Sequence, residues 1–248
     1  YMSKRQFTAY EINQLTKHCI DPLALADIIS PNIPIEYITC FAEFRNNNFV
    51  VDPAVLIPRV ETEELIDIAF TKIKNKENVI FCDIGTGSGA IGISFALELE
   101  KRGIRYYGIL SDVSKNALGV TGENLEELLP NNKSIKLLES DLMQKYPNVE
   151  FDVIFANLPY IPSERIKDLD CSVKDYEPLG ALDGGKDGLK CIKKLLIQAP
   201  KFLKQTGVII LEVDDTHTDT SEFNEHWNIE VKNDINNKNR FWIISKKL

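Results

Sequence analysis

From residue 61 onward, short apolar stretches rich in β-branched residues alternate with segments whose apolar residues recur at helical spacing. Strands are expected at residues 79–84, 106–111, 134–139, 151–156 and 208–213, and helices at residues 61–74, 89–101, 114–129 and 188–203. Apolar strands that alternate with helices form a parallel sheet with both faces covered. The pattern therefore predicts an α/β fold with a doubly wound sheet.

Two more strands are expected near the end of the chain, at residues 229–233 and 240–245, with a turn at Asn236 and Asn237 between them. The connection is too short for a crossover helix, so these two strands must pair antiparallel. Together with the earlier strands they complete a mostly parallel, seven-stranded sheet.

The first 60 residues follow a different pattern. Residues 1–45 resemble short helices interrupted by three prolines, and they are too few to form a core of their own. We therefore predict a short helical cap that rests on the main domain. Residues 46–60 begin with a run of asparagines that favours a turn, so a hairpin linker and a loop are expected there. Residues 61–248 then form the main domain.

Composition limits the partners and the location of this protein. The formal net charge is −8, and an acidic chain binds phosphate backbones poorly, which disfavours a nucleic-acid partner. The five cysteines include no Cys-x-x-Cys pair, which argues against a disulfide framework or a zinc site and favours the reducing cytoplasm, without a bound metal. No apolar run approaches the roughly 18 residues of a membrane span, so no membrane association is expected.

A glycine-rich loop follows the strand expected at residues 79–84. It consists of Gly85, Thr86, Gly87, Ser88 and Gly89, and Asp83 precedes it. Glycines let the backbone turn tightly beside a ligand, and the helix that follows offers free N–H groups. Asp112 ends the next strand at a spacing suited to ribose hydroxyls. The loop therefore predicts a nucleotide-like ligand.

The glycine pattern alone leaves the ligand open, because it also matches a dinucleotide fingerprint and a tight turn without any ligand. The carboxylate of Asp83 would repel a pyrophosphate but suits the ammonium and sulfonium groups of S-adenosylmethionine. We therefore predict S-adenosylmethionine as the cofactor. After the strand at residues 134–139, Asp141 is expected to accept a hydrogen bond from the adenine amine, and Leu142 to pack on the ring. The alternative role for Asp141 is a turn cap.

A tetrapeptide of Asn157, Leu158, Pro159 and Tyr160 ends the strand expected at residues 151–156. This is the edge at which doubly wound sheets bind ligands. The Asn157 side-chain oxygen and the Leu158 carbonyl can each accept one N–H of a planar NH2 group, and Pro159 stiffens the turn. Tyr160 can stack on that acceptor. The tetrapeptide predicts methyl transfer to an amide or amino nitrogen, and the alternative is an ordinary turn.

Three segments resemble the HemK/PrmC family of protein-glutamine N5-methyltransferases. They are residues 55–65 with the sequence VLIPRVETEEL, residues 157–161 with NLPYI, and residues 176–189 with YEPLGALDGGKDGL. Weaker similarity extends the resemblance from about residue 34 to the end of the chain. The resemblance implies a class I, Rossmann-like methyltransferase fold.

The resemblance also implies a substrate and a set of site residues. The substrate is the glutamine of the Gly-Gly-Gln motif in a class I peptide-chain release factor. Residues 85–89, Asp112, Leu142 and Asn157 line the cofactor site by this resemblance, and residues 157–160 hold the glutamine amide. Pro58, Arg59 and Glu61 lie near the substrate entry, where the alternative for Arg59 and Glu61 is a surface ion pair.

Two features depart from the family pattern. Leu158 replaces the first proline of the usual Asn-Pro-Pro-Tyr sequence, and Asn-Leu-Pro-Tyr also resembles rRNA adenine dimethyltransferases. Methylation of adenine N6 in RNA or DNA is therefore the alternative function. The helical segment before residue 55 is also shorter than in the family. A nicotinamide-dependent oxidoreductase and a cofactor-binding assembly factor without turnover are weaker alternatives.

Overall fold

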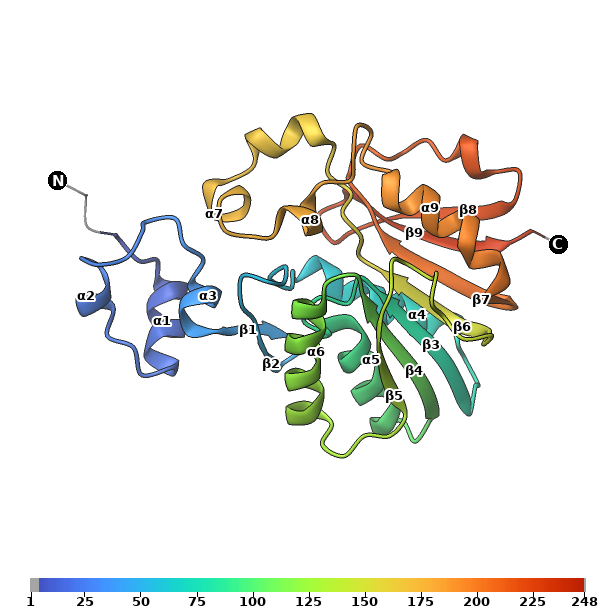
Figure 1. Cartoon of the computed structure of the whole chain (residues 1–248), viewed down its shortest axis with the longest axis horizontal. Coiled ribbons are helices and arrows are strands. Elements are labelled where there is room, and N and C mark those ends of the chain that lie inside the picture. Colours follow the sequence, from blue (N-terminus) through green and yellow to red (C-terminus); the bar gives the residue numbers. More distant parts are fainter. Residues whose placement is uncertain (1–4, 248) are drawn as a thin grey trace.

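The structure, a computed structural model, describes residues 5–247. Its centre is a seven-stranded sheet of order β5-β4-β3-β6-β7-β9-β8 (Figure 1). The strands are β3 (Asn78–Ile84), β4 (Arg105–Asp112), β5 (Ile135–Glu139), β6 (Phe151–Ala156), β7 (Leu203–Glu212), β8 (Trp227–Asn233) and β9 (Asn239–Lys246). β3 to β7 are parallel, whereas β9 is antiparallel to both β7 and β8. The predicted mostly parallel, seven-stranded sheet is confirmed.

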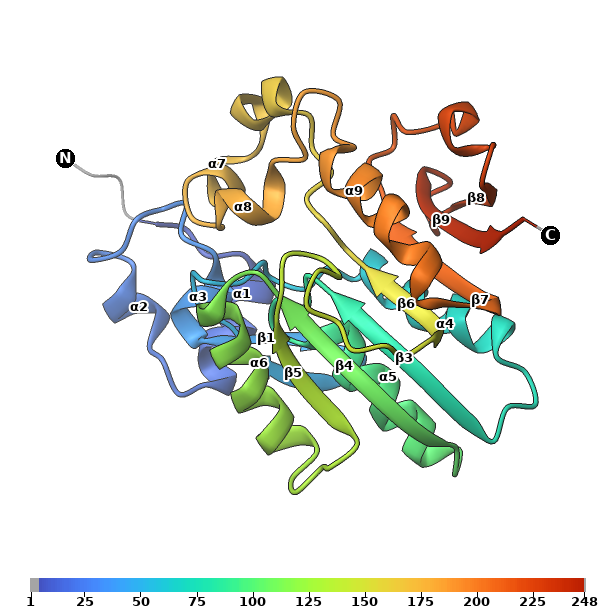
Figure 2. The ribbon, with the colours of Figure 1, turned by 45° about the vertical axis from the view of Figure 1, so that its right-hand side comes forward.

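Helices cover both faces of this sheet (Figures 1 and 2). They are α4 (Glu64–Lys72), α5 (Ala90–Lys101) and α6 (Lys115–Leu128) on one face, and α9 (Lys190–Gln198) on the other. Successive side chains of a strand point to opposite faces, so Phe81 packs with α4 and α5, whereas Cys82 packs with α9. The sheet is therefore doubly wound, as the sequence predicts.

The N-terminal segment forms a small helical unit followed by a hairpin, at the left of Figure 1. The helices are α1 (Ala9–Lys17), α2 (Pro22–Leu25) and α3 (Ile35–Thr39), and the hairpin pairs β1 (Phe41–Phe44) with β2 (Asn47–Val50). The turn lies at Arg45 and Asn46, both with positive φ, slightly before the centre of the asparagine run. Residues 51–60 then form a loop. The boundaries of a separate cap remain a prediction.

One side chain fastens this hairpin to the main domain. The Asn124 amide of α6 donates to the Val50 carbonyl at 2.9 Å, and its oxygen accepts from the Val50 N–H at 2.6 Å. The same amide donates to the Ser88 carbonyl in the glycine-rich loop at 2.9 Å. Asn124 is fully buried, so these bonds satisfy groups that water does not reach.

The helix expected at residues 188–203 is too long. α9 ends at Gln198, a 3₁₀ turn follows at Ala199–Lys201, and Leu203 already belongs to β7. Pro200 explains the difference, because proline lacks the N–H that a continuing helix needs. The segment between β6 and α9 also contains a 3₁₀ stretch and two short helices that the sequence did not suggest, Ser163–Asp168, α7 (Cys171–Lys174) and α8 (Leu179–Leu182).

In the part of the chain that the structure describes, no helix combines the length and apolar character required to cross a membrane.

Candidate active site

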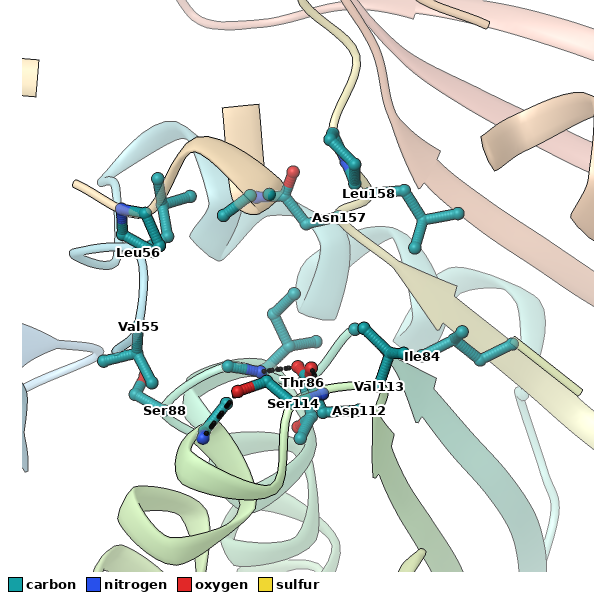
Figure 3. Close-up of a pocket in the computed structure, with 18 of the residues that line it drawn as sticks. Val55, Leu56, Ile84, Thr86, Ser88, Asp112, Val113, Ser114, Asn157 and Leu158 are labelled. Carbon is teal, nitrogen blue, oxygen red and sulfur yellow. Dashed lines mark hydrogen bonds between the residues drawn. The ribbon is translucent and has the colours of Figure 1, made fainter. Parts of the chain in front are cut away.

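A cavity of about 400 Å³ opens at the carboxyl ends of the parallel strands. Its walls come from the loops after β2, β3, β4, β5 and β6, together with residues 178–181 around α8. Asn157 and Leu158 lie across the cavity from Asp112 (Figure 3). The volume lies in the range typical of small-molecule sites, and the position matches the ligand edge of a doubly wound sheet.

The glycine-rich loop curls beneath the cavity with its backbone towards the open space. Gly85 and Gly87 have φ values of +69° and +57°, which glycine adopts without strain. A β-carbon on Gly85 would lie 3.1 Å from the Leu158 side chain. Thr86 and Ser88 also line the cavity. Gly89 does not line the cavity, and a β-carbon there would lie 2.7 Å from Ile93, so its role is to pack the loop on α5.

Asp83 lies under the loop and not in the cavity wall. Its Oδ2 accepts hydrogen bonds from the Thr86 hydroxyl at 2.6 Å and from the Gly92 N–H at 3.1 Å. Burial raises the pKa of Asp83 to about 6, although these two bonds act in the opposite direction. Both bonds use Oδ2, and Oδ1 has no hydrogen-bond partner among the residues that the structure describes, so the contact of Asp83 with the cofactor stays a prediction.

Asp112 lines the cavity, and its contact with a ribose stays a prediction. Its two oxygens accept from the Gly87 N–H at 3.0 Å and from the Ser114 N–H at 2.8 Å, which fixes the carboxylate between two loops. Burial raises its pKa, against the hydrogen bonds to the backbone. Each oxygen retains a further lone pair, so Asp112 can also accept from the hydroxyls of a ligand.

Asp141 and Leu142 both border the cavity, and their contacts with an adenine stay predictions. Leu142 is buried with φ of +50°, and Asp141 is exposed and accepts from the Gln144 amide at 2.9 Å. Sequence reasoning missed two neighbours in the wall, the buried Ser140 and the 70% exposed Val113. Both directly adjoin predicted residues, so the strand ends were the available signal.

The tetrapeptide after β6 is held by a buried carboxylate that the sequence analysis missed. The Asn157 amide nitrogen donates to Glu212 Oε2 at 3.2 Å, and the Tyr160 hydroxyl donates to Glu212 Oε1 at 2.9 Å. Thr62 also donates to Glu212 Oε2, at 2.6 Å. Glu212 ends the apolar strand β7, and an acidic residue at that position was the signal that could have identified it.

The structure separates the four residues of the tetrapeptide. Asn157, Leu158 and Pro159 line the cavity, whereas Tyr160 does not. Burial and the nearby Glu212 carboxylate raise the pKa of Tyr160. The Tyr160 hydroxyl donates to Glu212, and the stacking of its ring on the acceptor stays a prediction.

The Ile-Pro-Arg loop meets the Tyr-Glu-Pro segment through an ion pair. Arg59 donates to Glu177, whose side chain is only 1% exposed. Burial raises the pKa of Glu177, and the Arg59 charge opposes that effect. The alternative of a surface pair between Arg59 and Glu61 is wrong, because the partner is Glu177. Pro58 lines the cavity, but Arg59 and Glu61 do not.

The third recognised segment folds directly behind the tetrapeptide. Ile161 forms an isolated parallel bridge with Asp183, and the Gly184 N–H donates to the Ile161 carbonyl at 2.9 Å. A β-carbon on Gly188 would lie 2.3 Å from the Tyr160 carbonyl oxygen. Gly188 also has φ of +76°, so two constraints require glycine there. This segment therefore supports the turn that carries Asn157.

The residues around the cavity fit a nucleoside with a charged amino-acid tail. Unobstructed glycine backbone, an inward carboxylate at Asp112 and the apolar Leu142 supply the three kinds of contact that such a ligand needs. Among residues 5–247, no group of three or more histidine, cysteine, aspartate or glutamate side chains has the arrangement of a metal site.

Comparison with known proteins gives the class. A family model described as a methyltransferase domain matches residues 75–246. The ribosomal protein L11 methylase from Lactobacillus delbrueckii subsp. bulgaricus superposes with a TM-score of 0.54 at 18% identity, over 77% of this chain and 81% of its own. The hMettl16 catalytic domain in complex with MAT2A 3'UTR hairpin 1 superposes with a TM-score of 0.57 at 13% identity, over 83% of this chain and 74% of its own. These likenesses show the fold. Fold and family together define a class I S-adenosylmethionine-dependent methyltransferase.

Curated relatives narrow the class further. The release factor glutamine methyltransferase of Gloeobacter violaceus is 37% identical over 75% of this chain and 63% of its own length. Those of Lactococcus lactis subsp. lactis and Leptospira interrogans are 36% and 37% identical over 86% and 88% of this chain, and 73% and 76% of their own lengths. The chain belongs to the release factor glutamine methyltransferase family. The resemblance and the cofactor inferred from the sequence are confirmed.

This chain spans less than the full length of the relatives it matches, between 63% and 76% for these three.

Proposed function

We propose that this methyltransferase transfers a methyl group to the side-chain amide nitrogen, N5, of the glutamine in the Gly-Gly-Gln motif of a class I peptide-chain release factor. Family membership supports the substrate, and the geometry of Asn157 supports the chemistry. The observation that carries the proposal is that the Asn157 NH2 group is bonded to Glu212 and Thr62. Its oxygen is then available to the cavity.

An available carboxamide oxygen suits the chemistry of an amide acceptor. An amide nitrogen is a poor nucleophile because its lone pair is delocalised into the carbonyl, so orientation has to supply much of the rate. The Asn157 oxygen accepts one N–H of the glutamine, and the Leu158 carbonyl accepts the other. Positioning of this kind supplies up to about 7–11 kcal/mol of the barrier.

We assign the opposite wall to the cofactor, which supplies an electrophilic methyl group when it is bound. Asp112 accepts from the ribose hydroxyls, and Leu142 packs on the adenine with Asp141 beside its amine. The backbone of residues 85–88 contacts the amino-acid end. Asp83 acts through the loop, since it holds Thr86 and the start of α5. Pro58 lies where the substrate enters.

Arg59 acts at the entry as a brace and not as a direct ligand in this proposal. Its ion pair with Glu177 joins residues 118 positions apart and keeps the Ile-Pro-Arg loop against the segment that roofs the cavity. Glu61 is the first residue of the 3₁₀ turn Glu61–Glu63, whose Thr62 hydroxyl donates to Glu212. We propose that the protein acts in the cytoplasm, where release factors work.

The experiment is a methyl-transfer assay with labelled S-adenosylmethionine and a class I release factor. We expect label on the wild-type release factor and none on a variant whose Gly-Gly-Gln glutamine is changed to alanine. Equal labelling of both proteins would reject the assigned target. A parallel reaction with adenine-containing RNA and DNA tests the alternative, methylation of adenine N6, which the curated relatives do not favour.

A further inference from the structure

Glu212 occupies an unusual position for a carboxylate. It is 2% exposed at the last residue of β7, directly behind the tetrapeptide that lines the cavity. Three neutral donors converge on its two oxygens, the Thr62 hydroxyl, the Asn157 amide and the Tyr160 hydroxyl. They come from two separate parts of the chain, the 3₁₀ turn at residues 61–63 and the tetrapeptide at residues 157–160. A buried acidic group with this many directed contacts requires an explanation beyond packing.

The contact with Asn157 decides which way its carboxamide points. The oxygen and NH2 ends of an amide have nearly the same shape, so sterics alone do not choose between them. A carboxylate accepts but does not donate, so it selects the NH2 end of Asn157 and turns the oxygen away. In the reversed orientation, Asn157 would present NH2 to the NH2 of the substrate, and two donors would face each other.

We infer that Glu212 is a positioning residue that fixes the Asn157 carboxamide with its oxygen towards the acceptor and thereby sets the site for NH2 substrates. The inference rests on the proposed function for its link to rate, although the orientation of Asn157 is a property of the protein alone. Glu212 does not line the cavity, so it acts through Asn157 and the Tyr160 turn.

The ionised form of Glu212 is the one that serves all three donors, because a protonated carboxyl group must donate and would displace one of them. The charged and titratable groups that face it are Tyr160 after β6, Arg240 on β9 and Glu61 in the 3₁₀ turn. Burial raises the pKa of Glu212, against the bonds from Thr62 and Tyr160 and the Arg240 charge. Acidification therefore disturbs Asn157 at a higher pH than for an ordinary glutamate.

The first test separates positioning from simple structural support. Glu212→Leu removes all three contacts, and we expect kcat to fall about 10²-fold while the Kd for S-adenosylmethionine changes less than about threefold. Glu212→Gln retains one acceptor oxygen, so we expect a smaller fall of about tenfold and loss of the acid limb of the kcat–pH profile.

Asp152→Asn is the matched control, because it alters another carboxylate with a 2% exposed side chain, at the opposite end of the same sheet. It should leave kcat and the acid limb unchanged. An unchanged kcat in Glu212→Leu would overturn the inference. So would an equal loss of kcat in Asp152→Asn.

A second test needs no substrate. The side-chain amide signal of Asn157 in a ¹H–¹⁵N NMR spectrum is identified by its absence in Asn157→Ala. In the wild type and in Asp152→Asn we expect this signal to shift as Glu212 titrates, and in Glu212→Gln we expect that shift to disappear. The same pH response in Glu212→Gln and wild type would reject the inference. Failure to label a release factor would instead count against the proposed function alone.

Discussion

Two buried carboxylates at opposite ends of the sheet have opposite surroundings. Asp152, near the start of β6, accepts from Lys76, from Lys204 at 2.8 Å and from the Ile80 N–H at 2.8 Å. These bonds outweigh the effect of burial and lower its pKa. Glu212, at the end of β7, receives bonds from neutral groups, and burial raises its pKa.

The difference shows that the two ends of the sheet use a buried carboxylate for different purposes. At the amino end of the strands, two lysines neutralise a carboxylate and tie together three segments, which stabilises the sheet. At the carboxyl end, a carboxylate without a directly bonded cation orients polar side chains beside a cavity. A buried carboxylate without a bonded cation lowers the stability of the fold. Such groups cluster at functional sites.

The largest expected effect is on kcat, and it comes from a substitution at the carboxyl ends of the strands. Asn157→Ala removes the oxygen that we propose orients the acceptor, and we expect kcat to fall about 10²–10³-fold, as for the loss of one oriented polar group in other enzymes. Binding of S-adenosylmethionine, measured by calorimetry, should change less than about threefold. Undiminished methyl transfer by this variant would remove the basis of the proposed mechanism.

Gly188→Ala tests whether the carboxyl end depends on the segment behind it. The new methyl group would meet the Tyr160 carbonyl at 2.3 Å on a backbone with positive φ. We expect a loss of about 2–4 kcal/mol in the free energy of unfolding, measured with urea. Gly119→Ala is the control, because a β-carbon there meets nothing within 4 Å, and it should stabilise α6 by up to about 1 kcal/mol.

Asp112→Ala should affect the cofactor and not the chemical step. Loss of a charged acceptor at the cavity wall is expected to raise the Kd for S-adenosylmethionine about 10–100-fold. At saturating cofactor, kcat should stay within a few-fold of wild type. Asp141→Ala, at an exposed position of the same wall, should have the smaller effect on Kd. The reverse order would contradict the assignment of Asp112 to the ribose.

The smallest effects concern stability as a function of pH, and they should have opposite signs. Asp152 has a lowered pKa, so its stabilisation is present above the unfolded pKa and is lost as pH falls through the folded pKa. Glu212 has a raised pKa, so its stabilisation is present below the unfolded pKa and is lost as pH rises through the folded pKa.

Urea unfolding across pH measures both contributions. Asp152→Asn should be less stable than wild type at neutral pH, with a gap that closes under acid conditions. Glu212→Gln should be at least as stable as wild type at neutral pH. If both variants differed from wild type in the free energy of unfolding with the same sign, the two carboxylates would not contribute to stability in opposite ways.

Local sequence signals identified most of the fold and half of the site. The strands, the helices and the glycine-rich loop each have a signal within a few residues of sequence, namely apolar periodicity or clustered glycines. The apolar spacing predicts a helix to residue 203, whereas Pro200 ends α9 at Gln198. Signals from residues close in the chain thus identify the loops proposed to hold the cofactor.

The contacts around the tetrapeptide at residues 157–160 could not be predicted in the same way. Thr62 and Glu212 lie 150 residues apart in the chain, and Arg59 and Glu177 lie 118 apart, yet each pair is bonded. No local pattern reveals such pairs, so the sequence does not indicate the role of Glu212. The bonds that Asp83 receives from the Thr86 hydroxyl and the Gly92 N–H are likewise not visible in the sequence pattern.

The buried carboxamide of Asn124 gives the molecule a shared fastening. One nitrogen serves both the hairpin that leads into the Ile-Pro-Arg loop and the turn beneath the cavity. A displacement of the N-terminal unit that moves Asn124 away from Val50 also breaks the hydrogen bond between Asn124 and the Ser88 carbonyl. Asn124 therefore couples the position of the N-terminal hairpin to the conformation of the loop beneath the cavity.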